Sequence, residues 1–407
     1  MVNDGSPVRK SKITFQSVGW YLAFGLIPFG SSLPGLFVLL VERFIRLFKP
    51  YSGPKIPVSN LKIVRWANRL FLIFLGWMVI SGIFSPRPEM ALAQTLGFSL
   101  IVWVYIFGAQ KTAGSHFVTA ERYLPVFVAA SFGSSIIALL RFFIFHMDRA
   151  ENLPAGSING LGTILVLSMG LIIGYLYGRG GRWRYVLIPY LGVTLAALLA
   201  NKSRGAWLGF FVMLLCFGFL NRKFRIIAAI ILAILIIVFL TLPAMQTRIL
   251  SLTPANQLDR ILMYQATLKM IQDYPVFGIG AGVYPYVFPE YQIKDPRVVP
   301  ENHPFAHNLF LQLAAEFGLV GLVIFCTILG LIIFMSFKLA RTQNHFYQGI
   351  FAALIGVLIH QQVDLPIWGF DIGGAFWLLF GLIIGFYQFE FGRNRNQNLA
   401  PSQQGPN

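Results

Sequence analysis

Apolar runs of about 20 residues recur along almost the whole chain, and a helix of that length crosses the hydrocarbon core of a bilayer. The candidate runs lie near 66–84, 91–108, 124–145, 157–177, 185–200, 206–220, 226–242, 308–337, 346–364 and 371–390. Hydrophobic residues make up 56% of the 407 residues and charged residues only 12%, which is too apolar for a soluble protein of this size. We therefore predict an all-α, polytopic membrane protein.

The region 15–48 is too long for one membrane span. Its centre, IPFGSSLPG, contains Pro28, Gly30, Pro34 and Gly35, which interrupt helices and turn chains. We predict a hairpin of two short helices here. Together with the ten apolar runs, this hairpin gives about 12 transmembrane segments.

The distribution of basic residues predicts the orientation. With a cytoplasmic N-terminus, 22 of the 32 Lys and Arg residues fall on the cytoplasmic side, as the positive-inside rule requires. The predicted organisation is a cytoplasmic tail (1–14), nine membrane segments (15–242), one large outward loop (243–306), three membrane segments (307–390) and a disordered cytoplasmic tail (391–407). The net charge of +17 is spread over short loops without a basic groove, so the expected partner is membrane lipid and not nucleic acid.

Two cations lie in NKSRGAW, a very short outward connection between two predicted spans. A cation such as Lys202 or Arg204 costs free energy there unless it pairs with an anion or reaches water. Each is therefore either a ligand-binding group or a side chain that snorkels from a helix end. Gly205 allows the backbone to approach a ligand or another helix closely.

The outward loop contains PANQLDRILMYQATLKMIQDYPVFGIGAG, in which apolar residues follow helical spacing. Helix-start residues stand at 254–256 and helix-end residues at 275–278. We predict an amphipathic helix on the outer membrane surface, with Arg260 and Lys269 at headgroup height and Tyr264 one turn after Arg260. Arg260 is then a binding residue for a substrate or a contact to lipid phosphates.

His307 and Asn308 begin the next predicted span, AHNLFLQLAAEFGLVG, at the boundary between membrane and water. His307 is a base, a donor to phosphate or a polar residue at a helix start. His303 lies four residues earlier in the loop. No acidic or Cys cluster at metal-ligand spacing accompanies these histidines, so we expect no metal and no cofactor.

A second ionisable group stands at the outer end of the span 346–364. His360 and Asp364 are one turn apart, and we interpret them as a pair that closes a short turn. Asp371 begins the following span. The roles of these three residues are left open.

Two arginines and a histidine on one side of the membrane are suited to a polyanion held at the lipid surface. Arginine donates two parallel hydrogen bonds to phosphate and does not lose its charge, so it can neutralise a pyrophosphate in place of Mg²⁺. A histidine nearby can accept a proton from an attacking hydroxyl. We expect Arg204, Arg260 and His307 to converge on one outward cavity.

Three segments resemble the O-antigen ligase/polymerase family of bacterial membrane glycosyltransferases. They are SRGAWLG (203–209), DRILMYQATLKMIQDYPVFGIGAG (259–282) and AHNLFLQLAAEFGLVG (306–321), with one large outer loop before the last three spans. The resemblance covers roughly the second half of the chain. Tyr264 stands where the family often has Trp.

The resemblance implies a fold of the GT-C type and transfer of a glycan from undecaprenyl pyrophosphate to a lipid or glycan acceptor hydroxyl, without metal and with inversion. On that analogy Arg204 and Arg260 bind the pyrophosphate, and His307 activates the acceptor. Lys202, Tyr264, Asn308, His303 and Lys269 are the further substrate-binding candidates.

The resemblance also implies the bacterial inner membrane, with both termini cytoplasmic and the active site facing the periplasm. It leaves open whether the protein is a ligase or an O-antigen or exopolysaccharide polymerase. The alternative of another class is an inorganic-carbon (bicarbonate) or other small-anion transporter. A transporter typically has paired repeats and interrupted helices at mid-membrane, and neither is clear in this sequence.

Overall fold

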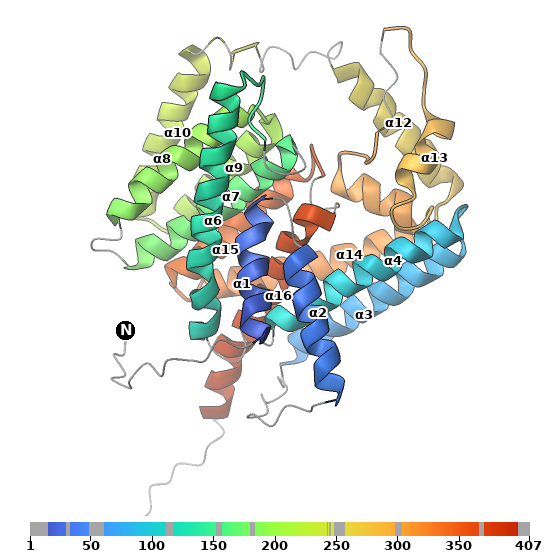
Figure 1. The fold of residues 1–407 in the computed structure, drawn as a ribbon, viewed down its shortest axis with the longest axis horizontal. Coiled ribbons are helices and arrows are strands. Elements are labelled where there is room, and N and C mark those ends of the chain that lie inside the picture. Colours follow the sequence, from blue (N-terminus) through green and yellow to red (C-terminus); the bar gives the residue numbers. More distant parts are fainter. Residues whose placement is uncertain are drawn as a thin grey trace, which may run out of the picture.

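The computed structural model describes residues 15–29, 33–48, 61–110, 117–151, 157–179, 184–241, 243, 246–247, 257–297, 303–365 and 370–397 (Figure 1). Within these ranges the chain is helical and contains no strand, which confirms the all-α class. Several predicted features lie outside the described residues: the tails 1–14 and 398–407, the hairpin centre at 30–32 and the helix start at 254–256.

Each of the ten predicted apolar runs coincides with one helix, or with α4 and the π-helical turn η2 together. The elements are α1 (Phe15–Leu26), η1 (Ile27–Phe29), α2 (Leu33–Phe48), α3 (Lys62–Ile83), α4 (Pro88–Val102), η2 (Trp103–Phe107), α6 (Phe117–Ile144), α7 (Ile158–Arg179), α8 (Arg184–Asn201), α9 (Arg204–Leu220), α10 (Phe224–Thr241), α12 (Leu258–Asp273), α13 (Tyr284–Tyr291), α14 (Leu309–Ala340), α15 (His345–His360) and α16 (Phe370–Gln397). Among the residues that the structure describes, six helices are long and apolar enough to cross a membrane, and five further apolar helices are shorter.

The first two helices pack side by side. Gly19 of α1 faces Leu39 of α2, and Gly35 of α2 approaches the backbone of Ala23 on α1. These pairings run in opposite directions along the two helices, so α1 and α2 are antiparallel. The arrangement is that of a hairpin.

The core around the site is formed by α7, α9 and α15, which pack at short range. Gly170 and Gly174 on α7 face Ala353 and Gly349 on α15, and Gly209 on α9 faces the Gly356 carbonyl of α15. Small residues let helix backbones approach closely and gain van der Waals contact where lipid supplies no hydrophobic driving force. The C-terminal end of α15 is thereby held between α7 and α9.

Helix α14 is interrupted at Gly318, which has φ 66° and ψ −178°. The loop 275–283 lies against the break: Ile279 and Gly280 donate backbone hydrogen bonds to the carbonyl groups of Ala315 and Glu316 at 2.9 and 2.8 Å. From α3, Trp77 donates to the Phe317 carbonyl at 2.8 Å. Helix α14 is therefore interrupted, a feature that the sequence did not indicate. At the break, N–H groups of the protein donate hydrogen bonds to the carbonyl groups of Ala315, Glu316 and Phe317.

Helix α12 packs against protein with one of its faces, and its predicted position on the membrane surface stays a prediction. Met263, Ala266 and Met270 of α12 are buried in a cluster with residues of α13 and α14. Figure 1 shows α12 and α13 together, to one side of the long helices. The prediction of a helix is confirmed, and Ile261 and Leu268 on the face assigned to lipid are 39% and 48% exposed.

Contacts between connections keep to two separate sides. Three contacts join predicted outward connections to one another: Ser85 with Ile279, Lys202 with Asp148, and Arg260 with Asp364. Two contacts join predicted cytoplasmic connections: Gln110 with Asn68, and Asn221 with His345. This segregation is what the predicted topology requires. Which side faces outward stays a prediction.

Candidate active site

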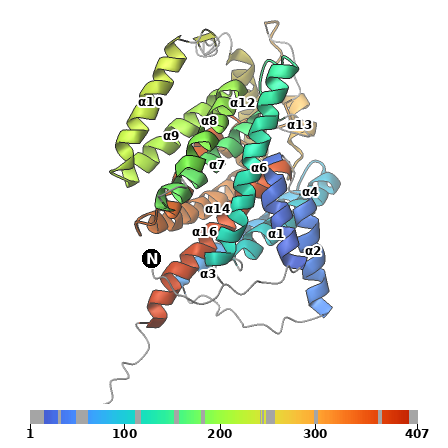
Figure 2. The same cartoon turned by 60° about the vertical axis from the view of Figure 1, so that its left-hand side comes forward.

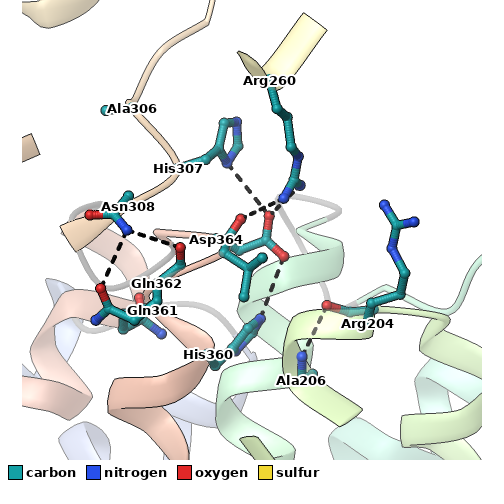
Figure 3. A network of polar contacts seen from close by, with 12 residues as sticks. Arg204, Ala206, Arg260, Ala306, His307, Asn308, His360, Gln361, Gln362 and Asp364 are labelled. Carbon is teal, nitrogen blue, oxygen red and sulfur yellow. Dashed lines mark hydrogen bonds and ion pairs between the residues drawn. The ribbon is translucent and has the colours of Figure 1, made fainter. Parts of the chain in front are cut away.

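The carboxylate of Asp364 lies at the centre of a cluster of cationic and imidazole side chains (Figure 3). Its Oδ1 atom lies 3.0 Å from Arg260 Nη2 and 3.6 Å from His307 Nδ1, and its Oδ2 atom lies 3.7 Å from His360 Nε2. The sum of the first two distances, 6.6 Å, is the upper limit of the separation between the Arg260 and His307 nitrogens. The structure thus brings Arg260 and His307 together on one buried carboxylate.

Arg260 is held by two contacts to the turn that follows α15. Its Nη1 donates to the Val363 carbonyl at 2.8 Å, while its Nη2 pairs with Asp364. The side chain of Arg260 is 29% exposed and that of Asp364 only 6% exposed. An ion pair of this kind is only partly screened by water, so removing either partner leaves the other poorly compensated.

The start of α14 is joined to the same turn, and this places His307. Asn308 caps α14 by accepting hydrogen bonds from the backbone of Phe310 and Leu311, and its amide donates to the Gln362 carbonyl at 3.1 Å. Leu309 donates its backbone N–H to the Gln361 carbonyl at 2.9 Å. His307 has φ 47°, a left-handed conformation that is uncommon for residues other than glycine and clusters at functional sites.

His360 is buried beneath Asp364 at the end of α15. Its Nδ1 lies 3.0 Å from the Thr163 hydroxyl on α7. Gly205 of α9 lies on the other side, where an added Cβ atom would come within 2.8 Å of the His360 ring and 3.3 Å of Asp364 Oδ2. The glycine expected to allow a close approach therefore makes one, to His360 and Asp364.

Arg204 begins α9 beside this cluster. Ser203 caps the helix by accepting from the Ala206 N–H, and Arg204 Nη2 donates to Gln257 Oε1 at 3.5 Å. Gln257 occupies the N-cap position of α12, three residues before Arg260, without a capping hydrogen bond from its side chain. Figure 3 shows the guanidinium group of Arg204 standing to one side of the Asp364 carboxylate. The three residues expected to converge lie around one turn, with Arg204 linked to α12 through Gln257.

His303 and Tyr264 lie close to the same cluster. His303 Nε2 is 3.1 Å from Asp259 Oδ1, and its ring meets the His307 ring edge to face at 5.9 Å. Burial raises the pKa of the Tyr264 hydroxyl, with smaller opposing effects from the charges of Arg260 and Asp364. Both residues therefore adjoin the pair formed by Arg260 and His307.

Two predicted substrate-binding lysines point elsewhere. Lys202 Nζ pairs with Asp148 Oδ1 at 3.0 Å, in the connection after α6. Lys269 is exposed and lies nine residues after Arg260, which is half a revolution away on an α-helix. The structure does not bring Lys269 to the Arg260 side of α12.

Burial raises the pKa of the Asp364 carboxyl, whereas the contacts with His307 and His360 and the charge of Arg260 lower it. Together, the lowering effects are larger, so the pKa lies well below its usual value. A carboxyl whose pKa is depressed by folding stabilises the fold above its unfolded pKa of about 3.9, and that contribution is lost as the pH falls through the folded pKa. Asp364 therefore stays ionised across the physiological range.

Residues 189–326 match the family model described as O-antigen ligase. This part of the chain is similar to the O-antigen ligase family. The match includes all three motifs on which the resemblance rested, and it confirms the recognition of the family. Together with the apolar helices of the described residues, the match supports an integral membrane protein with a region similar to O-antigen ligases. No curated protein matches the chain significantly.

The position of Asp364 was the main feature that sequence reasoning missed. His360 and Asp364 do close a turn, since the Asp364 N–H donates to the His360 carbonyl at 3.1 Å. The same turn also bonds α12 and the start of α14, which lie about 100 and 50 residues earlier in the chain. An ionisable residue at a span end was the available signal, and it could not show these distant partners. The side chain of Asp371 lies outside the described residues.

Replacing Gly205 by alanine should lower any activity that depends on the Asp364 cluster by at least about tenfold, because a small displacement of reacting groups has a large effect on rate. The added Cβ would meet the His360 ring at 2.8 Å and Asp364 Oδ2 at 3.3 Å, so at least one of the two groups would have to shift. Gly192→Ala on α8 is the matched control, because no heavy atom lies within 4 Å of its Cβ position. Envelope glycan profiles of cells producing each variant provide the measurement; equal profiles would contradict the close packing at Gly205.

Proposed function

We propose that this protein transfers a glycan from undecaprenyl pyrophosphate to an acceptor hydroxyl at the outer face of the bacterial inner membrane. One observation carries the proposal: Arg260 and His307 meet at one buried carboxylate, and both belong to the region that matches the O-antigen ligase model. Twelve spans, a GT-C type fold and an active site facing the periplasm are parts of this proposal.

The donor pyrophosphate would bind between Arg204 and Arg260. Arg260 already uses Nη1 and Nη2 to hold Val363 and Asp364, but each of these nitrogens carries a second hydrogen for phosphate. Asp364 offsets part of the positive charge when the site is empty. The donor would thus replace water around cations whose positions are set in advance, which favours stabilisation of the leaving group.

His307 would act as the base. Asp364 lies beside Nδ1, which favours the tautomer with a proton on Nδ1 and leaves Nε2 to accept the proton of the acceptor hydroxyl. The acceptor oxygen forms a bond to the anomeric carbon as the bond from that carbon to the pyrophosphate oxygen breaks. The electron pair leaves on undecaprenyl pyrophosphate, and attack from the opposite face inverts the sugar carbon.

Replacing His307 by alanine should abolish the glycan product, whereas a null strain restored with the wild-type gene should regain it. Loss of long glycan from the lipid core would identify a ligase, and loss of chain length would identify a polymerase of the same family. The measurement is a glycan profile of envelopes from a deletion strain carrying either gene, with immunoblots for equal protein. An unchanged glycan profile would contradict the proposal and favour transport of a small anion.

A further inference from the structure

A cavity of about 200 Å³ lies beside α14, between α4, the segment 281–286 and the segment 304–305. The residues that characterise its wall are Gln94, Phe98, Phe305, Glu316 and Phe317, with the half-exposed Tyr286 at its rim. Ligand pockets for drug-sized molecules span about 300–1,000 Å³, so this one suits a single small ring and not a whole oligosaccharide. We propose that it binds one sugar ring of the acceptor, an inference that rests on the proposed function.

The chemistry of the wall fits a sugar. Aromatic side chains can cover the apolar C–H face of a pyranose ring, while an amide and a carboxylate bind hydroxyl groups at its edge. Glu316 is 1% exposed, so its carboxylate is built into the wall and is not a solvated surface charge. A lipid acyl chain is a poorer occupant, because it would leave that carboxylate facing hydrocarbon.

Glu316 also connects the cavity with His307. Its Oε1 accepts hydrogen bonds from the Gly282 N–H at 2.9 Å and from the Gln312 amide at 3.0 Å. Gln312 in turn accepts from the Ala306 N–H at 2.7 Å, directly before His307. A continuous chain of hydrogen bonds thus connects the cavity wall with the start of α14 and with the residue next to the proposed base.

The distance along the chain also suits an acceptor. Phe305 lines the cavity and His307 follows two residues later, which limits the separation of their Cα atoms to about 7 Å. A sugar ring seated against Phe305 could therefore present a hydroxyl to His307. The interruption of α14 contributes, because Gly280 and Ser81 bond the Glu316 carbonyl at 2.8 and 2.9 Å and fix Glu316 in the wall.

The test is protection of a cysteine at the rim of the cavity. Tyr286→Cys is introduced into the full chain with Cys216→Ser and Cys326→Ser, in phospholipid nanodiscs prepared without glycoside detergents. Tyr286 and Leu268 are each 48% exposed, so Leu268→Cys on α12, outside the cavity wall, is the matched control. The probes are methyl glycosides of glucose, galactose, rhamnose and N-acetylglucosamine, with sodium laurate to represent an acyl chain.

At least one glycoside should slow maleimide labelling at position 286, by about fivefold at a concentration of about four times Kd, and leave position 268 unchanged. Adding Glu316→Gln, which keeps the side-chain volume and an acceptor oxygen, should remove this protection. Protection by laurate alone would overturn the proposal in favour of a lipid site. Absence of protection by every probe would overturn it as well.

This outcome is separable from failure of the proposed function, because labelling requires no transfer. Protection should persist when His307→Ala is added to the same protein. If His307→Ala left the envelope glycans unchanged while glycosides still protected position 286, the transferase proposal would fail and the sugar site would stand.

Discussion

Replacing Asp364 by asparagine should lower glycan transfer by about 10²- to 10⁴-fold, the range over which a misoriented catalytic histidine reduces rate. Asparagine keeps the size of the side chain but removes its charge and turns one oxygen into an N–H₂ donor. The N–H₂ donor would face either the Arg260 guanidinium, which is itself a donor, or the His360 imidazole, whose nitrogen is a donor in one tautomer. The neutral amide would also no longer favour a proton on Nδ1 of His307. The measurement is the transfer rate of purified full-length protein with a saturating lipid-linked donor.

Asp273→Asn is the control for this change. Asp273 lies at the end of α12, is exposed, and accepts a hydrogen bond from the Tyr291 hydroxyl at 2.6 Å. Its replacement should leave transfer within about threefold of wild type, as for a surface substitution away from the site. Wild-type transfer by Asp364→Asn would show that Asp364 only closes the turn after α15, as the sequence suggested.

Most of the fold could be predicted because a membrane allows few kinds of backbone structure to span it. Hydrocarbon requires backbone groups to be satisfied within a segment, so apolar runs of about 20 residues become helices whatever they pack against. The runs at 157–177 and 206–220 thus appear as α7 and α9. The packing of α12 could not be derived this way, because only its contacts with α13 and α14 show which of its apolar residues are buried against protein.

The candidate site was predictable in its cations and not in its centre. Arg204, Arg260 and His307 are polar residues beside apolar spans, where an ionisable group is costly unless it is paired or hydrated. Each could therefore be identified from its own local sequence. Asp364 is also conspicuous in the sequence, but its role depends on partners from α12, α14 and α7. No local sequence pattern indicates that these helices meet at Asp364. Likewise, no hydropathy pattern indicates that Gly318 interrupts α14.

The interrupted helix bears on the transporter alternative. Unwound backbone in transporters exposes carbonyl groups that coordinate ions. At the break in α14, the carbonyls of Ala315, Glu316 and Phe317 instead accept hydrogen bonds from Ile279, Gly280 and Trp77. The break is therefore better explained as a joint that fixes Glu316 and the first turns of α14 against the loop 275–283.

Replacing Arg260 by lysine should lower transfer by about 10²-fold even though the charge is kept. The guanidinium group reaches the Val363 carbonyl with Nη1 at 2.8 Å and Asp364 with Nη2 at 3.0 Å. A lysine ammonium is a single point on a flexible stem and cannot reproduce that fork, so either the turn or the phosphate loses its donor. Arg297→Lys is the matched control, because the side chain of Arg297 is 74% exposed and pairs with Asp295, two residues earlier, at 2.8 Å. Transfer by the control should be unchanged.

The double variant Arg260→Lys with Asp364→Asn decides whether the two residues act as one unit. If they do, the loss in the double variant should be close to that of the more damaging single change, because each change alone already disrupts the same arrangement. Losses that multiply would mean that Arg260 binds the donor independently of Asp364. In that case the short distance between them would be a structural contact, and His307 alone would depend on the carboxylate.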